Sequence, residues 1–318
     1  MLMNQHRVLI IGARRNKQGL GEFIAQGFDL CGANICSIVG TSPDTLKQAT
    51  DNLNTRYQIE THGYTDLRTA IEETAPSIVA ICSPYQFHLQ QLQIVAEYGL
   101  HCLCEKPLCW DEDSVSAIRE VERIIEQFRQ NNRLLSLVAQ WPFTLDEYFS
   151  LFPDVKNQPP RHFNMLLGPL SSGTKMVVDA LPHILSMIYT LVGVGTISDI
   201  QSQFGDDQNR LRIDFQYQHE NGNLIVTVNL VKTLERPRPA GYAINGYTVT
   251  RKIELPEYQT FFIDNLGREI KLEDPLQKLI HGFLDDIDKG LPTKMDELIA
   301  SIRDLSTIIE NINLHTKL

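Results

Sequence analysis

Short apolar runs without alternating polar residues recur through the first 140 residues, and this feature constrains the fold most strongly. Such runs are typical of strands whose two faces are both covered, as in a parallel sheet. Amphipathic segments separate them, and one of these carries an apolar stripe from Val115 to Phe128. The order predicts an α/β domain over residues 1–140, built on a doubly wound parallel sheet. The predicted strands cover residues 7–11, 34–39, 77–82, 101–104 and 134–138.

Residues 141–318 show a different pattern. Helical periodicity over 145–151 and 177–192 precedes several alternating strands, and Asn221-Gly222 between two of them is a strong hairpin signal. This order predicts an α+β domain with a large, mostly antiparallel open sheet, whose last helix could pack back on the first domain. The predicted strands cover 211–215, 224–228, 248–255 and 260–264, and the closing helices cover 275–289 and 295–313.

The net charge of the chain indicates which classes of macromolecule it does not bind. There are 39 acidic and 29 basic side chains, and the formal charge of −10 repels nucleic-acid phosphates and anionic lipids. Residues 1–7 have no charged leader before an apolar stretch, and no apolar run is long enough to cross a bilayer. We therefore expect a soluble, cytoplasmic protein that binds neither nucleic acid nor membrane.

Six cysteines are present, and none forms a C-x-x-C pair. A metal cluster of His101, Cys102, Cys104 and Cys109 is conceivable. Reduced cysteines packed as small apolar side chains are the favoured interpretation, so we predict no metal site.

A glycine-containing turn, residues 12–21, follows the first strand and precedes a helical pattern. Glycines at this position let the backbone approach a dinucleotide pyrophosphate, and the helix N-terminus favours its negative charge. The turn lacks G-x-G-x-x-G and is longer than that fingerprint, so an ordinary strand-to-helix turn is the alternative. The predicted contacts are Gly12, Ala13, Arg14, Arg15, Gly19, Leu20 and Gly21.

The end of the second predicted strand bears on the choice of cofactor. Val39-Gly40-Thr41-Ser42 offers no carboxylate to an adenosine ribose 2′-hydroxyl. Thr41 and Ser42, with Arg14 or Arg15 nearby, could instead accept a 2′-phosphate, so the sequence favours NADP over NAD. The alternative is that these arginines are solvated loop charges.

The segment Glu105-Lys106-Pro107 follows the predicted strand 101–104. Ala80-Ile81-Cys82-Ser83-Pro84 and His88 precede it, in the order strand, turn, helix, strand and turn. Together they resemble the glucose–fructose oxidoreductase, inositol dehydrogenase and rhizopine catabolism family of NAD(P)-dependent oxidoreductases. The resemblance extends to Asp274-Pro275-Leu276 and implies a Rossmann fold for residues 1–140. It implies substrate binding and oligomerisation, as a homodimer or homotetramer through the sheet, for residues 141–318.

In that family the lysine of this segment faces the nicotinamide and the substrate. The resemblance therefore implies a catalytic Lys106 on a turn fixed by Pro107, where a cis peptide bond is possible. The alternative is a surface charge paired to Glu105. The resemblance also implies cofactor contacts from Ser83, Pro84, His88, Glu105 and Lys106.

A second match is Asp179-Ala180-Leu181-Pro182-His183, where the family has an aspartate and a histidine four residues apart. On a helix this interval places both side chains on one face, provided that Pro182 lies in the first turn. The resemblance implies that His183 moves the substrate proton while Asp179 orients it. A structural histidine among apolar neighbours is the alternative.

The chain departs from the family's pattern near the expected substrate pocket. Residues 171–176 replace paired glycines, and Gln140-Trp141-Pro142 stands where many members have Asn and Arg. We place Trp141 and Lys175 at the pocket, although Trp141 could equally pack in the domain junction.

The main hypothesis is hydride transfer between a nicotinamide cofactor and a carbinol or carbonyl carbon of a small polar, sugar- or cyclitol-like substrate, with Lys106, His183 and Asp179 as catalytic residues. A reductase of a non-sugar substrate, such as an imine, and a non-catalytic dinucleotide-binding regulator are the alternatives.

Overall fold

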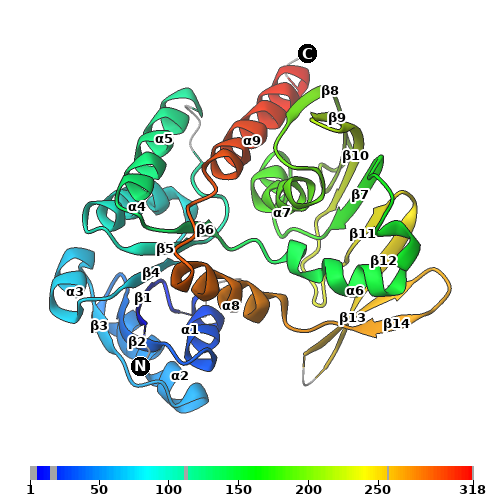
Figure 1. Ribbon diagram of the computed structural model, residues 1–318. Helices are drawn as coiled ribbons and strands as arrows, with labels where there is room; N and C mark the ends of the chain where they lie inside the picture. Colours follow the sequence, from blue (N-terminus) through cyan, green and yellow to red (C-terminus); the bar gives the residue numbers. More distant parts are fainter. Residues whose placement is uncertain (1–5, 15–19, 111–113, 256–257, 317–318) are drawn as a thin grey trace. The chain divides into compact units, whose positions relative to one another are not determined.

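The computed structural model describes residues 6–14, 20–110, 114–255 and 258–316. The chain divides into two compact units. The first comprises Met1–Val138 and Leu276–Leu298, and the second comprises Ala139–Pro275 and Ile299–Leu318. Each unit contains one sheet with its own helices (Figure 1).

The first unit contains a six-stranded sheet in the order β3-β2-β1-β4-β5-β6, with all neighbours parallel. The chain builds outward from β1 in one direction and then from β4 in the other, so the strand order reverses between these two strands. This arrangement confirms the predicted doubly wound sheet. The strands are β1 (Arg7–Ile11), β2 (Asn34–Val39), β3 (His62–Tyr64), β4 (Ile78–Ile81), β5 (His101–Cys104) and β6 (Leu135–Leu137).

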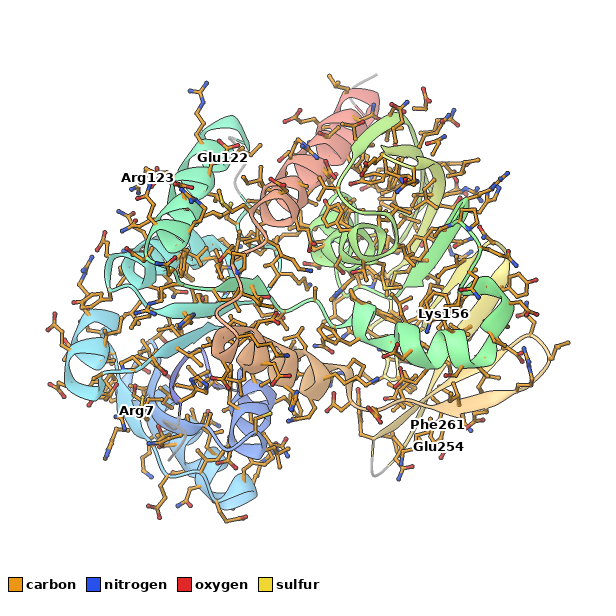
Figure 2. The ribbon with its side chains drawn as sticks, in the orientation of Figure 1. Arg7, Glu122, Arg123, Lys156, Glu254 and Phe261 are labelled. Atoms are coloured by element: carbon orange, nitrogen blue, oxygen red, sulfur yellow. The ribbon has the colours of Figure 1, made fainter. Side chains whose placement is uncertain are left out.

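Helices cover this sheet, and their apolar stripes account for their positions. In α5 the side chains of Val121, Ile124 and Phe128 are buried, whereas Glu122 and Arg123 project from the outer side (Figure 2). The helices of the first unit that precede the second sheet are α1 (Gly21–Leu30), α2 (Pro43–Tyr57), α3 (Leu67–Thr74), α4 (His88–Glu97), α5 (Ser114–Gln130) and the short η1 (Tyr85–Phe87).

One further helix of the first unit, α8 (Pro275–Asp288), comes from late in the chain. Phe283 packs edge-on against Phe28 of α1, with ring centroids 6.3 Å apart. Gln277 donates a hydrogen bond to the carbonyl of Gly27. The sequence placed this helix in residues 141–318 and allowed the last helix to pack back, whereas the structure groups α8 with the first sheet.

The second unit contains an eight-stranded sheet in the order β14-β13-β12-β11-β7-β10-β9-β8. Only β7 and β10 are parallel neighbours, so the predicted, mostly antiparallel sheet is confirmed. The predicted hairpin is β9–β10, closed at Glu220-Asn221. The strands are β7 (His162–Leu167), β8 (Thr196–Phe204), β9 (Arg210–His219), β10 (Gly222–Val231), β11 (Ala240–Ile244), β12 (Tyr247–Glu254), β13 (Gln259–Asp264) and β14 (Glu269–Lys271).

One face of this sheet carries the core of the unit. Alternate strand residues such as Ile213, Val226 and Val249 are fully buried, because successive side chains point to opposite faces. Helix α7 packs against β7 and β10, and η2 packs against α7. The helical elements of this unit are η2 (Trp141–Thr144), α6 (Leu145–Leu151), η3 (Pro153–Val155), α7 (Lys175–Val192) and α9 (Met295–Thr316), of which the first turn groups with the first unit.

Helix α7 corrects one expectation. The sequence allowed Pro182 only in a first turn, but the helix begins at Lys175 and Pro182 lies in its interior. The proline has no N–H, so one hydrogen bond to the carbonyl of Val178 is lost, while its ring is buried. Packing of both flanking halves of the helix offsets that loss. In the described part of the chain, α7 is the one helix whose length and hydropathy would suit a membrane span, and most of it is buried inside the protein.

His101, the first residue of β5, supports a prediction on stability. Its Nδ1 accepts a hydrogen bond from the Leu134 N–H at 2.9 Å, which requires a neutral ring. Burial, helped by Arg133 and His6, lowers the pKa of His101 from 6.5 to about 4. Its stabilising contribution is therefore complete above pH 6.5 and is lost as the pH falls toward 4.

We expect the free energy of unfolding to fall by about 1 kcal/mol from this group between pH 7 and pH 5, allowing for its partial exposure to solvent. His101→Asn keeps an acceptor but cannot titrate, so it should lose this part of the pH dependence. Urea denaturation of both proteins at the two pH values measures the difference. Identical pH dependence would contradict the assignment.

Candidate functional site

The turn after β1 brings the backbone of three segments together at the carboxyl edge of the first sheet. Gly12 has φ +80°, and its N–H donates to the carbonyl of Val39 at the end of β2. A Cβ on Gly12 would lie 2.9 Å from the Cys82 carbonyl oxygen, and one on Gly21 would lie 2.2 Å from the Gly12 carbonyl oxygen. Both positions therefore require glycine, and the N-terminus of α1 is held directly behind β1.

This geometry suits the pyrophosphate role predicted for the turn. The positive end of the α1 dipole lies at the strand-order reversal, where open parallel sheets bind ligands. Ala13 is buried, Arg14 is exposed and Leu20 is half-buried. Arg15 and Gly19, also predicted as contacts, lie outside the described residues.

Of the two residues after β2 that were predicted to contact the cofactor, one has a structural role and the other is exposed. The Ser42 side chain caps α2, accepting from the Thr45 N–H, and the Thr45 hydroxyl accepts from the Ser42 N–H in return. Thr41 is exposed, and so is Asp44 in the first turn of α2. The Ser42 hydroxyl, predicted as a cofactor contact, is thus engaged by its own helix.

His88 at the start of α4 is fully buried, with 0% of its surface exposed. Its Nε2 lies 2.8 Å from the Ser83 carbonyl oxygen, and its Nδ1 lies 2.9 Å from the Pro107 carbonyl oxygen. Burial lowers the pKa of His88, whereas the carbonyls of Ser83, Pro107 and Leu108 act in the opposite direction. The ring joins the loop after β4 to the loop after β5, so we assign His88 to holding these loops together. The resemblance had implied a direct contact with the cofactor instead.

The Glu105-Lys106-Pro107 segment follows β5 directly. The Glu105 N–H donates to the carbonyl of Ile81 on β4, and the Lys106–Pro107 peptide bond is cis. Burial raises the pKa of Glu105, against the lowering effect of the Lys106 ammonium group. Lys106 itself is half-buried, so a charged group stands at the carboxyl edge of the sheet. Beside it, Ser83 is half-buried and donates to Gln91, and Pro84 is exposed.

The other predicted residues lie in the second unit, on α7. Asp179 and His183 are both half-buried and lie one helical turn apart on one face, while Lys175 is exposed one turn earlier. The Ser171 hydroxyl makes a short hydrogen bond to the Asp179 carboxylate. The Arg238 guanidinium also lies within electrostatic reach of Asp179. The carboxylate is thus held from the loop before α7.

Trp141 in η2 belongs to the same unit and is buried. Its ring meets Tyr242 edge-on at a centroid distance of 6.1 Å, and the Arg251 guanidinium lies 5.7 Å from the ring centroid. Trp141 therefore packs inside the second unit, and its predicted place at the substrate pocket stays a prediction. The sequence analysis did not identify Ser171, Arg238 or Arg251. Arg251 could have been identified, because it lies between Val249 and Ile253 at an inward-facing position of an alternating strand.

The imagined metal cluster does not suit the structure. Cys102, Cys104 and Cys109 are buried, and burial raises the pKa of each of the first two thiols. A protonated, buried thiol is a poor metal ligand. Over the described ranges, no three His, Cys, Asp or Glu side chains gather in a group that could hold a metal ion.

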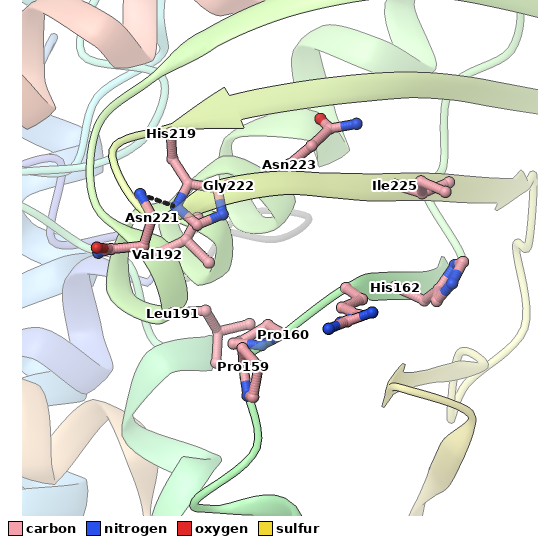
Figure 3. Close-up of a pocket in the computed structure, with 11 residues that line it drawn as sticks. Pro159, Pro160, His162, Leu191, Val192, His219, Asn221, Gly222, Asn223 and Ile225 are labelled. Atoms are coloured by element: carbon pink, nitrogen blue, oxygen red, sulfur yellow. Dashed lines mark hydrogen bonds between the residues drawn. The ribbon is translucent and has the colours of Figure 1, made fainter.

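A cavity of about 690 Å³ lies at the other end of α7 (Figure 3). Leu191 and Val192 line it together with residues at the starts of β7 and β10, among them His162 and Asn223. Val192 follows Asp179 by thirteen positions on α7, or roughly 20 Å along the axis. None of the predicted site residues lines this cavity, so it is separate from the candidate site.

The doubly wound sheet with its glycine turn defines a dinucleotide-binding domain of the Rossmann class, and comparison with known proteins agrees. Residues 6–138 match the model of the oxidoreductase family with an NAD-binding Rossmann fold. This match agrees with the resemblance carried by Glu105-Lys106-Pro107. The first unit is thus similar to the NAD-binding domain of that oxidoreductase family.

Solved structures share the fold of nearly the whole chain, although no curated protein matches it significantly. An inositol dehydrogenase homologue from Azotobacter vinelandii, complexed with NADH and myo-inositol, is 16% identical with a TM-score of 0.72, covering 97% of this chain and 96% of its own. Myo-inositol 2-dehydrogenase from Lactobacillus plantarum is 15% identical with a TM-score of 0.71, covering 98% of each chain. UDP-N-acetylglucosamine 3-dehydrogenase from Acidithiobacillus ferrooxidans is 16% identical with a TM-score of 0.67, covering 97% of each.

The position of His88 leads to a testable expectation. His88→Ala removes the ring that lies between the Ser83 and Pro107 carbonyls and leaves a cavity, so the free energy of unfolding should fall by about 2–4 kcal/mol. Affinity for the dinucleotide should fall as well, because the two loops at the carboxyl edge lose their link. Denaturation curves and a cofactor titration measure the two effects. His62→Ala, at an exposed position on β3, is the control and should change neither; equal effects of the two variants would rule out the linking role.

Proposed function

We propose that this protein transfers a hydride between a nicotinamide dinucleotide and a carbinol or carbonyl carbon of a small polar, sugar- or cyclitol-like substrate. The observation that carries the proposal is Lys106, presented at the carboxyl edge of an NAD-binding sheet by a turn that β4, β5 and His88 hold in place. Asp179 and His183 on one face of α7 supply the proton chemistry that such a transfer needs. The neighbours named for inositol and UDP-N-acetylglucosamine support the substrate class.

The roles follow from the side-chain chemistry. His183 takes the hydroxyl proton during oxidation and returns it during reduction, and Asp179 stabilises the cationic ring. Ser171 fixes the Asp179 carboxylate by its hydrogen bond. Lys106 stabilises negative charge that develops on the substrate oxygen. The bound nicotinamide supplies the two-electron chemistry, which the side chains cannot perform themselves.

His183→Ala tests the proton-transfer role. Turnover should fall by a factor of about 100 to 10,000, as is usual when a general acid–base is removed. Dinucleotide affinity should stay within about twofold, because His183 lies in the second unit. Steady-state kinetics and a nicotinamide-fluorescence titration measure the two quantities. Unchanged turnover would remove His183 from the mechanism, and binding without any turnover of a substrate panel by the wild type would favour a dinucleotide-binding regulator.

We further propose that NADP is preferred to NAD. Residues 40–42, at the end of β2, carry no carboxylate, and Arg14 is exposed on the neighbouring turn. The exposed Asp44 carboxylate in the first turn of α2 opposes a 2′-phosphate and limits the preference.

The cofactor preference has a matched pair of tests. NADPH should bind about tenfold more tightly than NADH, and Arg14→Ala should weaken NADPH alone, since only NADPH carries the 2′-phosphate. Thr41→Asp should reverse the order, because a carboxylate repels that phosphate and accepts from a free 2′-hydroxyl. Fluorescence titrations with both dinucleotides measure the affinities. An equal loss for both in Arg14→Ala would contradict the proposal.

We propose a cytoplasmic homo-oligomer that associates through the outer face of the second sheet. The six free cysteines suit a reducing compartment. The outer sheet face mixes polar pairs, such as Thr227 with Asp214 and Asn229 with Asn164, with an Ile225 side chain that is 45% exposed. A molar mass measured in solution tests the association.

A further inference from the structure

Arg251 on β12 is a charged side chain in an apolar setting. Its neighbours in the inward row are Val249, which is fully buried, and Ile253, so it points to the core-bearing face of the sheet. The guanidinium lies over the Trp141 ring, and its Nη2 donates to the Arg238 carbonyl at 2.9 Å. Burial lowers the pKa of Arg251, and the neighbouring Arg238 lowers it further.

The described part of the chain does not neutralise this charge. No carboxylate lies within ion-pair distance of Arg251 there, and its Nε is buried without an acceptor. A half-buried cation without a counter-ion, and a buried N–H without an acceptor, both cost free energy. The ring of Trp141 and one carbonyl oxygen offset only part of that cost.

A second guanidinium lies next to the first and connects it to the candidate site. Arg238 precedes β11, which pairs with β12; its carbonyl accepts the hydrogen bond from Arg251, and its guanidinium is close enough to lower the pKa of Arg251. Arg238 is also within electrostatic reach of Asp179 on α7. The two guanidinium groups are therefore on the same side of the second unit as the predicted proton-transfer pair.

We propose that Arg251, with Arg238 beside it, is the subsite for an anionic group of the substrate, a carboxylate or a phosphate. Guanidinium groups present planar sets of N–H donors that match these oxygens, and Arg251 retains some exposed surface. Because it holds a single hydrogen bond, it can turn toward an incoming anion at little cost. The substrate class is thus a hydroxy or oxo compound that carries a negative charge, and this part of the proposal rests on the proposed hydride transfer.

Anion binding can be tested without knowing the substrate. Inorganic phosphate and malonate are titrated into the full-length protein at constant ionic strength, with tryptophan fluorescence as the readout because Arg251 lies over Trp141. We expect saturable binding of at least one anion, and the tighter of the two distinguishes phosphate from carboxylate recognition. Arg251→Met keeps the aliphatic stem, removes the charge, and should weaken binding tenfold or more.

Two further variants keep the test decisive. Lys252→Met removes the same charge from the adjacent residue, whose ammonium group pairs with Glu254 and Glu269, and should bind the anion like the wild type. Arg251→Lys keeps the charge but loses the planar donors, and should bind several-fold more weakly even if Arg251→Met fails to fold. Equal binding by wild type, Arg251→Lys and Arg251→Met, or no saturable binding of either anion, would overturn the subsite.

Turnover then separates the subsite from the proposed function. Glucose, glucuronate and glucose 6-phosphate are compared as substrates with both dinucleotides. We expect kcat/KM of a charged member to exceed that of glucose at least tenfold in the wild type, with the ratio falling toward one in Arg251→Met. Turnover that shows no such advantage would overturn the substrate class. Arg251-dependent anion binding without turnover of any polyol would support the subsite while rejecting the proposed hydride transfer to sugars.

Discussion

Backbone pairing in the first sheet determines where chemistry can occur in that unit. Its inner strands hydrogen-bond on both sides and are buried on both faces, so the side chains that can meet a ligand lie at the strand ends. Gly12, Ser83 and Lys106 follow β1, β4 and β5 at the same edge, because the strands are parallel. The glycine turn, the helix dipole and the lysine thus converge without any direct bond between them.

The buried His88 shows how this edge is kept in shape. A neutral imidazole has one N–H and faces two carbonyl oxygens, so it donates to one of them at a time. The loops after β4 and β5 are therefore linked by a group whose hydrogen bonding depends on tautomer and protonation. In the second unit, the Ser171 hydroxyl likewise holds the Asp179 carboxylate in place by a hydrogen bond. In each unit, a residue predicted to act on the substrate is held by a neighbouring residue. The sequence motifs did not assign this structural role to either neighbour, His88 or Ser171.

Much of the architecture was predictable because it follows from local patterns. Strands β1, β2 and β5 and helix α6 have the predicted bounds, since each is a compact run with a clear period. The short edge strand β3 was missed because it is mostly exposed and contains a glycine, and β11 was missed because its small residues show no alternation. Helix α7 runs through Pro182 because packing outweighs one lost hydrogen bond, which no propensity reveals. The motif residues of the candidate site were found by resemblance, whereas the approach of Arg238 to Asp179, with Arg251 beside Arg238, follows only from the strand pairing.

The grouping of α8 with the first sheet bears on how the protein forms during synthesis. Residues 1–138 emerge from the ribosome first, whereas Phe283, which packs on Phe28 of α1, belongs to a helix that is made much later. The second unit interrupts the first, so the nascent dinucleotide-binding region waits for more than a hundred further residues before its apolar surface is closed. At ordinary rates of translation this interval is of the order of ten seconds. During it, the exposed face of α1 is a natural binding surface for chaperones, and residues 1–138 expressed alone would retain that liability permanently.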